Sequence, residues 1–387
     1  MSAAEPPFTL GVEEEYLLVD RVSRDLISEA PSTMLPECEA LLAGRVAPEF
    51  LQSQIEVGTR VCTTLAEARD ELEHLRATVA EVAACHKLAI VAASTHPFAN
   101  WDRQRPTSRE RYATLARDLQ GVARRLIICG MHVHVGIPDD DLRIDLLSQV
   151  TYILPHLLAL STSSPFWRGT NTGLMSYRIA VFDELPRTGL PEQFDSFGEY
   201  QRHVRVLVNA GLIEDATKLW WDVRPSARFP TLEMRITDVC TRLEDGIAIA
   251  ALYRCWLRML WRLKGENQRW RRYAAMLINE NRWLAQRYGY AKGLVDFGKG
   301  HIVPYADLLE EILVLITPDT AHFGCQAEVA HARTILKRGT SAHWQLATFE
   351  AARKEGASER EALEAVVDML IRETLAGLGA ERAAAAV

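Results

Sequence analysis

The chain has 387 residues, 48% hydrophobic and 25% charged, and a net charge of −7, which is typical of a globular protein and argues against general binding to nucleic acids or anionic membranes. Its seven cysteines are scattered without a C-x-x-C pair, which fits a reducing cytoplasm rather than a disulfide framework. The N-terminus shows no signal-peptide pattern, and no apolar run reaches the roughly 20 residues of a membrane helix.

The first third of the chain predicts two strands, 8–19 and 50–61, separated by a loop-rich segment with several prolines. Residues 64–88 predict a helix with Thr64 as N-cap, because apolar residues recur there at steps of three and four. A short buried strand at 89–94, a loop at 100–108 and a helix capped by Ser108 and ending near Leu119 follow.

The clearest strand of the sequence is 127–137, and it is followed by a mostly helical segment at 141–160 and a long polar loop with aromatic residues. Two further strands are predicted at 220–224 and 231–239. Almost everything from 245 to 378 has a helical pattern, with interruptions at 289–304 and 317–318.

Strands therefore occur only in the first two thirds, and helices lie between and after them. This order predicts an α+β fold rather than a doubly wound parallel sheet. We find no internal repeat and no low-complexity linker. We expect a single domain, 1–387, with a sheet-bearing part at 8–243 and a mainly helical part at 244–380.

Four segments alternate apolar residues with charged or metal-binding residues. On a strand, every second side chain points to the same face. Each segment therefore places two polar side chains on one face and its apolar residues on the other. The pairs are Glu13 and Glu15, Gln54 and Glu56, His132 and His134, and Glu233 and Arg235. If the strands share one sheet, its polar face is suited to metal ions and phosphates.

The three consecutive glutamates, 13–15, repel one another unless a cation is bound nearby. Carboxylates are the hard oxygen ligands that divalent cations prefer, so Glu13, Glu15 and Glu56 are candidate ligands, and Glu49 is a further one. The alternative is an edge strand whose carboxylates are simply solvated.

The two histidines on one face suggest a second ligand type. With Cys129 they could indicate zinc, but strand alternation puts Cys129 on the opposite face, and no other cysteine or histidine completes a zinc spacing.

Glu233 and Arg235 could form a surface salt bridge of little energetic value. Beside acidic neighbours, Arg235 could instead hold a phosphate bidentately. Arg168, Arg178 and Arg224 are further candidate cations. The sequence has no Walker A motif and no G-x-G-x-x-G after a strand, so phosphate would have to bind to the sheet face.

Together these motifs resemble the YbdK-type carboxylate–amine ligases, the glutamate–cysteine ligase type 2 family, which is related in fold to glutamine synthetase. The resemblance spans about residues 8–370, and it depends on the order and spacing of six short motifs. These are GVEEEY (11–16), QIEVGT (54–59), GMHVHVG (130–136), SPFWRGTNTG (164–173), LEMR (232–235) and DFG (296–298).

The resemblance implies a curved antiparallel sheet of about six strands backed by helices, with ATP and two or three Mg²⁺ ions, or Mn²⁺, in its concavity. The residues that match metal ligands of the family are Glu13, Glu15, Glu56, His132 and Glu233, with Glu49 as a further candidate. Arg235 matches a phosphate-facing arginine and is, with Glu233, an expected catalytic residue. Arg178 and Arg224 are expected nucleotide or substrate contacts, whereas His134 lies where relatives vary.

The implied reaction joins L-glutamate and L-cysteine with ATP through an acyl phosphate, giving γ-glutamylcysteine, ADP and phosphate. The expected partners are small amino-acid substrates, and the apolar C-terminal helices suggest a homodimer. Two alternatives remain open from the residues alone: a zinc hydrolase that uses His132 and His134, and a protein that binds ATP and Mg²⁺ without catalysis.

Overall fold

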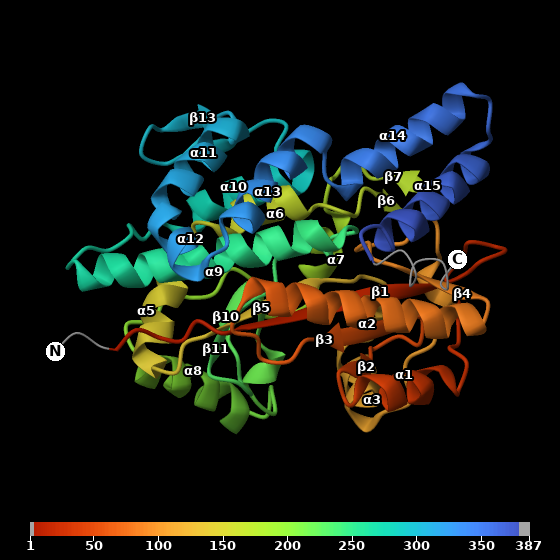
Figure 1. The fold of residues 1–387 in the computed structure, drawn as a ribbon. Coiled ribbons are helices and arrows are strands. Elements are labelled where there is room, and N and C mark those ends of the chain that lie inside the picture. The colour runs from red at the N-terminus through yellow and green to blue at the C-terminus, as the bar shows by residue number, and fades with distance from the viewer. Residues whose placement is uncertain (1–3, 379–387) are drawn as a thin grey trace.

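The computed structural model describes residues 4–378, apart from the side chains of residues 111, 113 and 115. Its centre is a seven-stranded sheet in which all neighbouring strands are antiparallel, which confirms the expected α+β fold with an antiparallel sheet (Figure 1). The strands in order are β10 (Val223–Pro225), β11 (Thr231–Met234), β5 (Met131–Gly136), β1 (Leu10–Asp20), β3 (Gln54–Gly58) and β2 (Val46–Pro48), and β4 (Leu88–Val91) pairs with the end of β1.

The register of the sheet brings the four alternating segments together. Glu13 lies opposite His132 across β1 and β5, and Glu15 lies opposite Glu56 across β1 and β3. Glu233 on β11 lies opposite His134. The apolar residues between them are buried on the other face. A shift of one residue in the pairing of the strands would therefore turn the core side chains toward the polar face.

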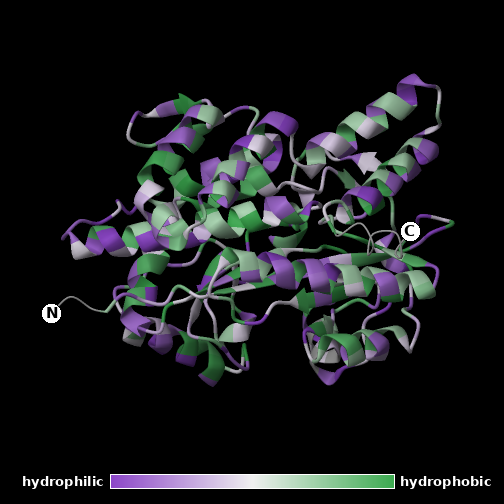
Figure 2. Cartoon of the chain, viewed as in Figure 1, coloured by the Kyte–Doolittle hydropathy of each residue, from purple (hydrophilic) through white to green (hydrophobic). Residues whose placement is uncertain are grey.

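Three helices cover the apolar face of the sheet: α2 (Leu65–Cys85), α5 (Asp140–Val150) and α9 (Leu243–Gly265). Thr64 starts α2 as predicted, because its side chain accepts from the Glu67 amide in a capping box. Figure 2 shows hydrophobic residues along most of α9 and hydrophilic residues at its C-terminal end, in agreement with the burial of most residues from Leu243 to Leu260.

The C-terminal part is helical as expected and lies above the sheet in Figure 1, while α1, α3 and α8 lie below it. The remaining helices are α1 (Met34–Leu42), α3 (Glu110–Leu119), α4 (Gly121–Arg124), α6 (Leu154–Ser161), α7 (Tyr177–Phe182), α8 (Phe197–Asn209), α10 (Ala275–Tyr288), α11 (Tyr305–Leu315), α12 (Thr317–Phe323), α13 (Gln326–Arg338), α14 (Ser341–Lys354) and α15 (Glu359–Thr374). Short strand pairs β6–β7 (Phe166–Trp167, Thr170–Asn171), β8–β9 (Thr188–Gly189, Trp220–Trp221) and β12–β13 (Leu294–Asp296, His301–Val303) lie outside the main sheet. The proposed single domain stays a prediction, and its ends at 1–3 and 379–387 lie outside the described residues.

Several local predictions were wrong. The segment predicted as loop before residue 50 contains α1, which tolerates Pro36 because the first turn of a helix needs no amide donor there. The helix predicted at 141–160 is two helices bent by 67°, with Pro155 in the first turn of the second. Arg109, not Ser108, precedes α3, and it makes no side-chain cap.

No single helix in residues 4–378 has the length and apolar character to cross a membrane, although the bent pair α5 and α6 meets those two criteria together.

Candidate active site

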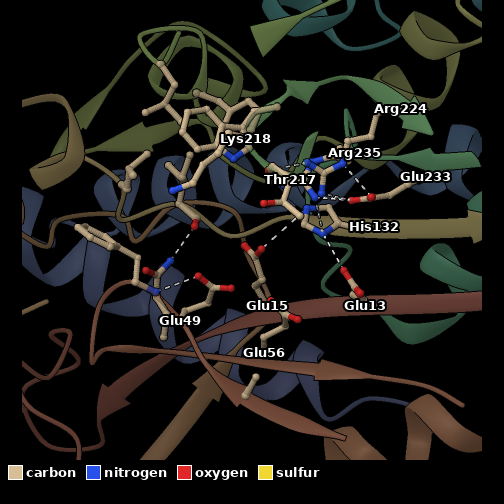
Figure 3. A pocket seen from close by; sticks show the side chains of 18 of the residues that line it. Glu13, Glu15, Glu49, Glu56, His132, Thr217, Lys218, Arg224, Glu233 and Arg235 are labelled. Carbon is tan, nitrogen blue, oxygen red and sulfur yellow. Dashed lines mark hydrogen bonds and ion pairs between the residues drawn. The ribbon is translucent and has the colours of Figure 1, made fainter. Parts of the chain in front are cut away.

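A cavity of about 470 Å³ lies on the polar face of the sheet, between the strands and the loops below them. It is lined by every residue that the resemblance matches to metal or nucleotide, and Figure 3 labels ten of its side chains, which converge on it from strands and loops. The expected residues that line it are Glu13, Glu15, Glu49, Glu56, His132, Arg178, Arg224, Glu233 and Arg235.

The first cluster in this cavity is acidic. Glu15, Glu49 and Glu56 each place a carboxylate oxygen within 4.8 Å of the other two. Burial and the charge of Glu49 raise the pKa of Glu15 to about 8, although Arg178, Arg235 and the Gly130 amide oppose the shift. Burial and Glu49 likewise raise the pKa of Glu56 well above its ordinary value. Three carboxylates this close need a proton or a cation between them.

The second cluster joins three strands. Glu13, His134 and Glu233 also have ligand atoms within 4.8 Å of one another. Burial alone would raise the pKa of Glu13, but hydrogen bonds and charge from His132 and His134 lower it well below its ordinary value. The pKa of His134 is raised despite burial, because Glu13 and Glu233 stabilise its cation. His134, whose role the sequence left in doubt, therefore belongs to a group of candidate ligands.

His132 lies between the two clusters. Its Nδ1 is 3.1 Å from Glu13, and its Nε2 is 3.8 Å from Glu15. Burial and the neighbouring Arg235 lower the pKa of His132 to about 4. A neutral imidazole is the form that binds a metal ion, so His132 can serve either cluster at neutral pH.

Glu233 is held by two arginines. Its carboxylate accepts hydrogen bonds from Arg224 at 2.8 and 3.0 Å and from Arg235 at 2.5 Å. Burial opposes its ionisation, but the charges of Arg235 and Arg224 lower the pKa of Glu233 far below its ordinary value. Arg235 Nε is buried without a hydrogen-bond partner, so this guanidinium has a donor left for a ligand.

Arg178 is almost fully buried at the edge of the cavity. Its guanidinium donates to the carbonyls of Ile236 and Arg235 at 3.2 and 3.1 Å, directly after β11. Gly130 leaves room for it, since a Cβ there would lie 2.4 Å from Arg178 Nη2. Arg178 thus supports the backbone that carries Arg235.

Three residues considered in the sequence lie elsewhere. Arg168 stacks at 5.9 Å from the Trp101 ring and does not line the cavity. Cys129 is buried, and its Sγ accepts from Gln54. Glu14 points into the core and pairs with Arg76, so the middle glutamate of the three is neutralised by an arginine rather than by a metal ion.

Sequence reasoning missed the cavity residues that come from α3, α7, β9 and the loops. Phe182, Leu185 and Trp220 form an apolar side of the cavity together with Leu119, Leu126 and Ile128. Lys218 and Tyr112 also line it. No alternation marks these positions, although Lys218 and Trp220 directly precede the strand that carries Arg224.

The family model of glutamate–cysteine ligase family 2 matches residues 9–368. A Rhodospirillum rubrum protein provisionally named glutamate–cysteine ligase 2 is 64% identical over 98% of this chain and 99% of its own length. A Jannaschia protein with the same provisional name is 54% identical over 95% of this chain and 96% of its own.

Two solved structures share the fold at low sequence identity. Glutamate–cysteine ligase from Francisella tularensis, solved in complex with AMP, has a TM-score of 0.67 at 14% identity and covers 99% of this chain and 92% of its own. A bifunctional glutathione synthetase from Pasteurella multocida has a TM-score of 0.67 at 15% identity, with 97% of this chain and 54% of that one covered. The chain therefore belongs to glutamate–cysteine ligase family 2, a family of ligases.

Proposed function

We propose that the protein joins the γ-carboxylate of glutamate to the amine of cysteine, with cleavage of ATP to ADP and phosphate. The observation that carries the proposal is the convergence of two clusters of metal-ligand side chains and one arginine donor in a single cavity. In this reaction the carboxylate attacks the γ-phosphorus of ATP, and ADP leaves. The amine nitrogen then attacks the resulting acyl phosphate, and phosphate leaves.

The donor chemistry fits divalent metal ions. One cluster, Glu15, Glu49 and Glu56, offers only carboxylates, which suits Mg²⁺. The other, Glu13, His134 and Glu233, includes an imidazole, and Mn²⁺ is compatible with both. His132 is a further ligand candidate between them. Two or three bound ions would neutralise the charge of the phosphates.

Arg235 is the residue to which we assign stabilisation of the transferred phosphoryl group. Glu233 fixes its Nη1, the Arg235 side chain lines the cavity, and its buried Nε has no hydrogen-bond partner. A guanidinium that is already oriented loses little freedom when charge develops on phosphate oxygens. Glu233 acts with it by holding this geometry and by contributing to the second cluster.

The apolar side of the cavity suits the base of the nucleotide. Phe182, Leu185 and Trp220 offer a surface for a flat ring, while the carboxylates and arginines lie on the strands. With the base there, the triphosphate would extend toward the metal clusters, and the amino acids would bind beyond it.

The test is ADP release by the purified protein with ATP, Mg²⁺ and pairs of amino acids. We expect release only when an acid and an amine are both present, with glutamate and cysteine as the first pair. Binding of ATP without ADP release from any pair would identify the protein as a silent nucleotide binder. Stoichiometric zinc that survives dialysis would favour the hydrolase instead.

The small-molecule substrates follow from this proposal, and the homodimer and the cytoplasmic location remain predictions. Light scattering of the purified protein measures the oligomeric state directly.

A further inference from the structure

The arginine and lysine side chains that line the cavity differ in how many of their N–H groups already donate hydrogen bonds within the protein. Arg224 uses four N–H donors within the protein: its Nε and Nη2 bind Glu233, and its Nη1 binds the carbonyls of Thr217 and Leu219 at 3.0 and 2.8 Å. The expected contact of Arg224 with nucleotide or substrate stays a prediction, and its hydrogen bonds in the structure go to Glu233 and to two backbone carbonyls. Arg178 likewise donates to carbonyls.

Lys218 is different. It lines the same cavity, and its side chain is only 10% exposed. Its nearest acidic group is Glu214, at 3.6 Å, and the Glu214 side chain is 62% exposed. This ion pair is long and its acidic partner is exposed, so the Lys218 ammonium keeps N–H donors for an anionic ligand in the cavity. The rim arginines Arg109 and Arg228 are exposed.

The backbone around Lys218 is held rigidly. Arg224 donates to the carbonyls of Thr217 and Leu219, on either side of Lys218. Arg187 Nε donates to the Lys218 carbonyl at 3.0 Å, and the Lys218 amide donates to the Asp215 carbonyl. Figure 3 shows Lys218 and Thr217 beside Arg224 and Arg235 in the cavity. A short turn fixed at this many points can present one side chain in a defined position.

The ligand of Lys218 follows from its neighbours. Trp220, two residues later, belongs to the apolar side of the cavity, and its ring is covered on one face by Arg187 at 5.4 Å. Lys218 lines the same cavity as this apolar side and the arginines of the strands. We infer that the Lys218 ammonium contacts a phosphate group of the bound nucleotide, and that Arg224 serves to hold the turn that carries it. This inference rests on the proposed function.

The first experiment compares nucleotide affinity by titration calorimetry for the wild type and Lys218→Met, which keeps the apolar stem. We expect ATP–Mg²⁺ and AMP to bind about 10- to 100-fold more weakly to the variant, and adenosine to bind equally, because only the phosphate contact is lost. The KM for glutamate should not change. Equal ATP affinity, or a raised KM for glutamate with unchanged ATP affinity, would overturn the assignment.

Glu214→Gln is the matched control. If Lys218 serves only to pair with Glu214, this variant will weaken nucleotide binding as much as Lys218→Met does, and the inference fails. We expect it to bind ATP like the wild type. Lys299→Met, at an exposed lysine on the β12–β13 hairpin, controls for loss of a charge.

A second measurement needs no variant and applies if Lys218→Met does not fold. Acetylation of the wild type with an amine reagent, read by mass spectrometry, should be slowed at Lys218 by ATP–Mg²⁺ and unchanged at Lys299. No protection of Lys218 would contradict the contact. If the wild type binds no nucleotide at all, the proposed function fails, whereas equal binding by the variant overturns only this inference.

Discussion

Glu14 and Arg76 form an ion pair behind the sheet, with Arg76 Nη2 2.7 Å from a Glu14 oxygen and neither side chain exposed. Arg76 also donates to the carbonyls of Thr241, Cys240 and Thr374, so it joins β1 and α2 to the loop before α9 and to the end of α15. The two neighbours of Glu14 on β1 point the other way, into the cavity. The pair therefore fixes the strand that presents Glu13 and Glu15.

Glu14→Gln should lower the free energy of unfolding by about 3–5 kcal/mol, because it leaves a buried guanidinium without its counter-charge. Urea unfolding followed by circular dichroism measures this. Glu39→Gln, at an exposed glutamate of α1, should change stability by less than about 0.5 kcal/mol. Equal stability of both variants would show that the pair contributes little.

The acidic cluster predicts a dependence of stability on pH and metal. The pKa of Glu15 is raised from its ordinary value of 4.5 to about 8 in the folded state. Between these two pH values, the folded protein holds a proton on Glu15 that the unfolded chain has lost. The contribution of Glu15 to the free energy of unfolding is therefore fully present below pH 4.5 and is lost as the pH rises through about 8.

We expect the metal-free protein to be less stable at pH 8.5 than at pH 6.5, and saturating Mg²⁺ to remove most of the difference. Thermal unfolding with EDTA or with Mg²⁺ measures it. Glu56→Gln should weaken the dependence, because it removes one of the repelling carboxylates. A difference in stability between pH 6.5 and pH 8.5 that Mg²⁺ does not alter would contradict the assignment of this cluster as a metal site.

Gly130→Ala should disturb Arg178, because the added Cβ would lie 2.4 Å from its guanidinium. The flexible end of Arg178 can move, so we expect a modest loss of stability, about 1–3 kcal/mol, but a clear loss of turnover as the support of Arg235 shifts. Steady-state kinetics and urea unfolding separate the two effects. Gly121→Ala meets no atom within 4 Å and should behave like the wild type.

Arg235→Lys should reduce kcat by about 10²–10³-fold with folding intact, since lysine keeps the charge but loses the planar fork that contacts Glu233 and that we propose for the phosphate. Arg224→Lys should mainly reduce stability, because Arg224 binds Glu233 and two backbone carbonyls. Kinetics and thermal unfolding of both variants, side by side, test this division. Equal kcat losses with equal stability would refute it.

Strand alternation alone predicted which face would carry the site. Glu13 and Glu15 lie on one face because side chains of a strand alternate, and the pairing of the strands adds Glu56 and Glu233 to that face. The resemblance supplied the family, which the family model confirms over residues 9–368. The roles of the individual site residues stay predictions.

The partners of these residues could not be predicted in the same way. Arg76 meets Glu14 from 62 positions away, and Arg224 reaches the turn of Lys218 through backbone carbonyls, which leave no residue pattern. The acidic run suggested a metal at Glu13 and Glu15 but no partner for Glu14, for which packing of α2 against β1 provides an arginine.

The most direct test of the account follows an oxygen atom. Glutamate labelled with ¹⁸O in its γ-carboxylate is incubated with the protein, ATP, Mg²⁺ and cysteine, and the phosphate released is analysed by mass spectrometry. An acyl phosphate transfers one carboxylate oxygen to phosphate for each amide formed, so we predict one ¹⁸O per phosphate. Amide and ADP formed with unlabelled phosphate would contradict the mechanism.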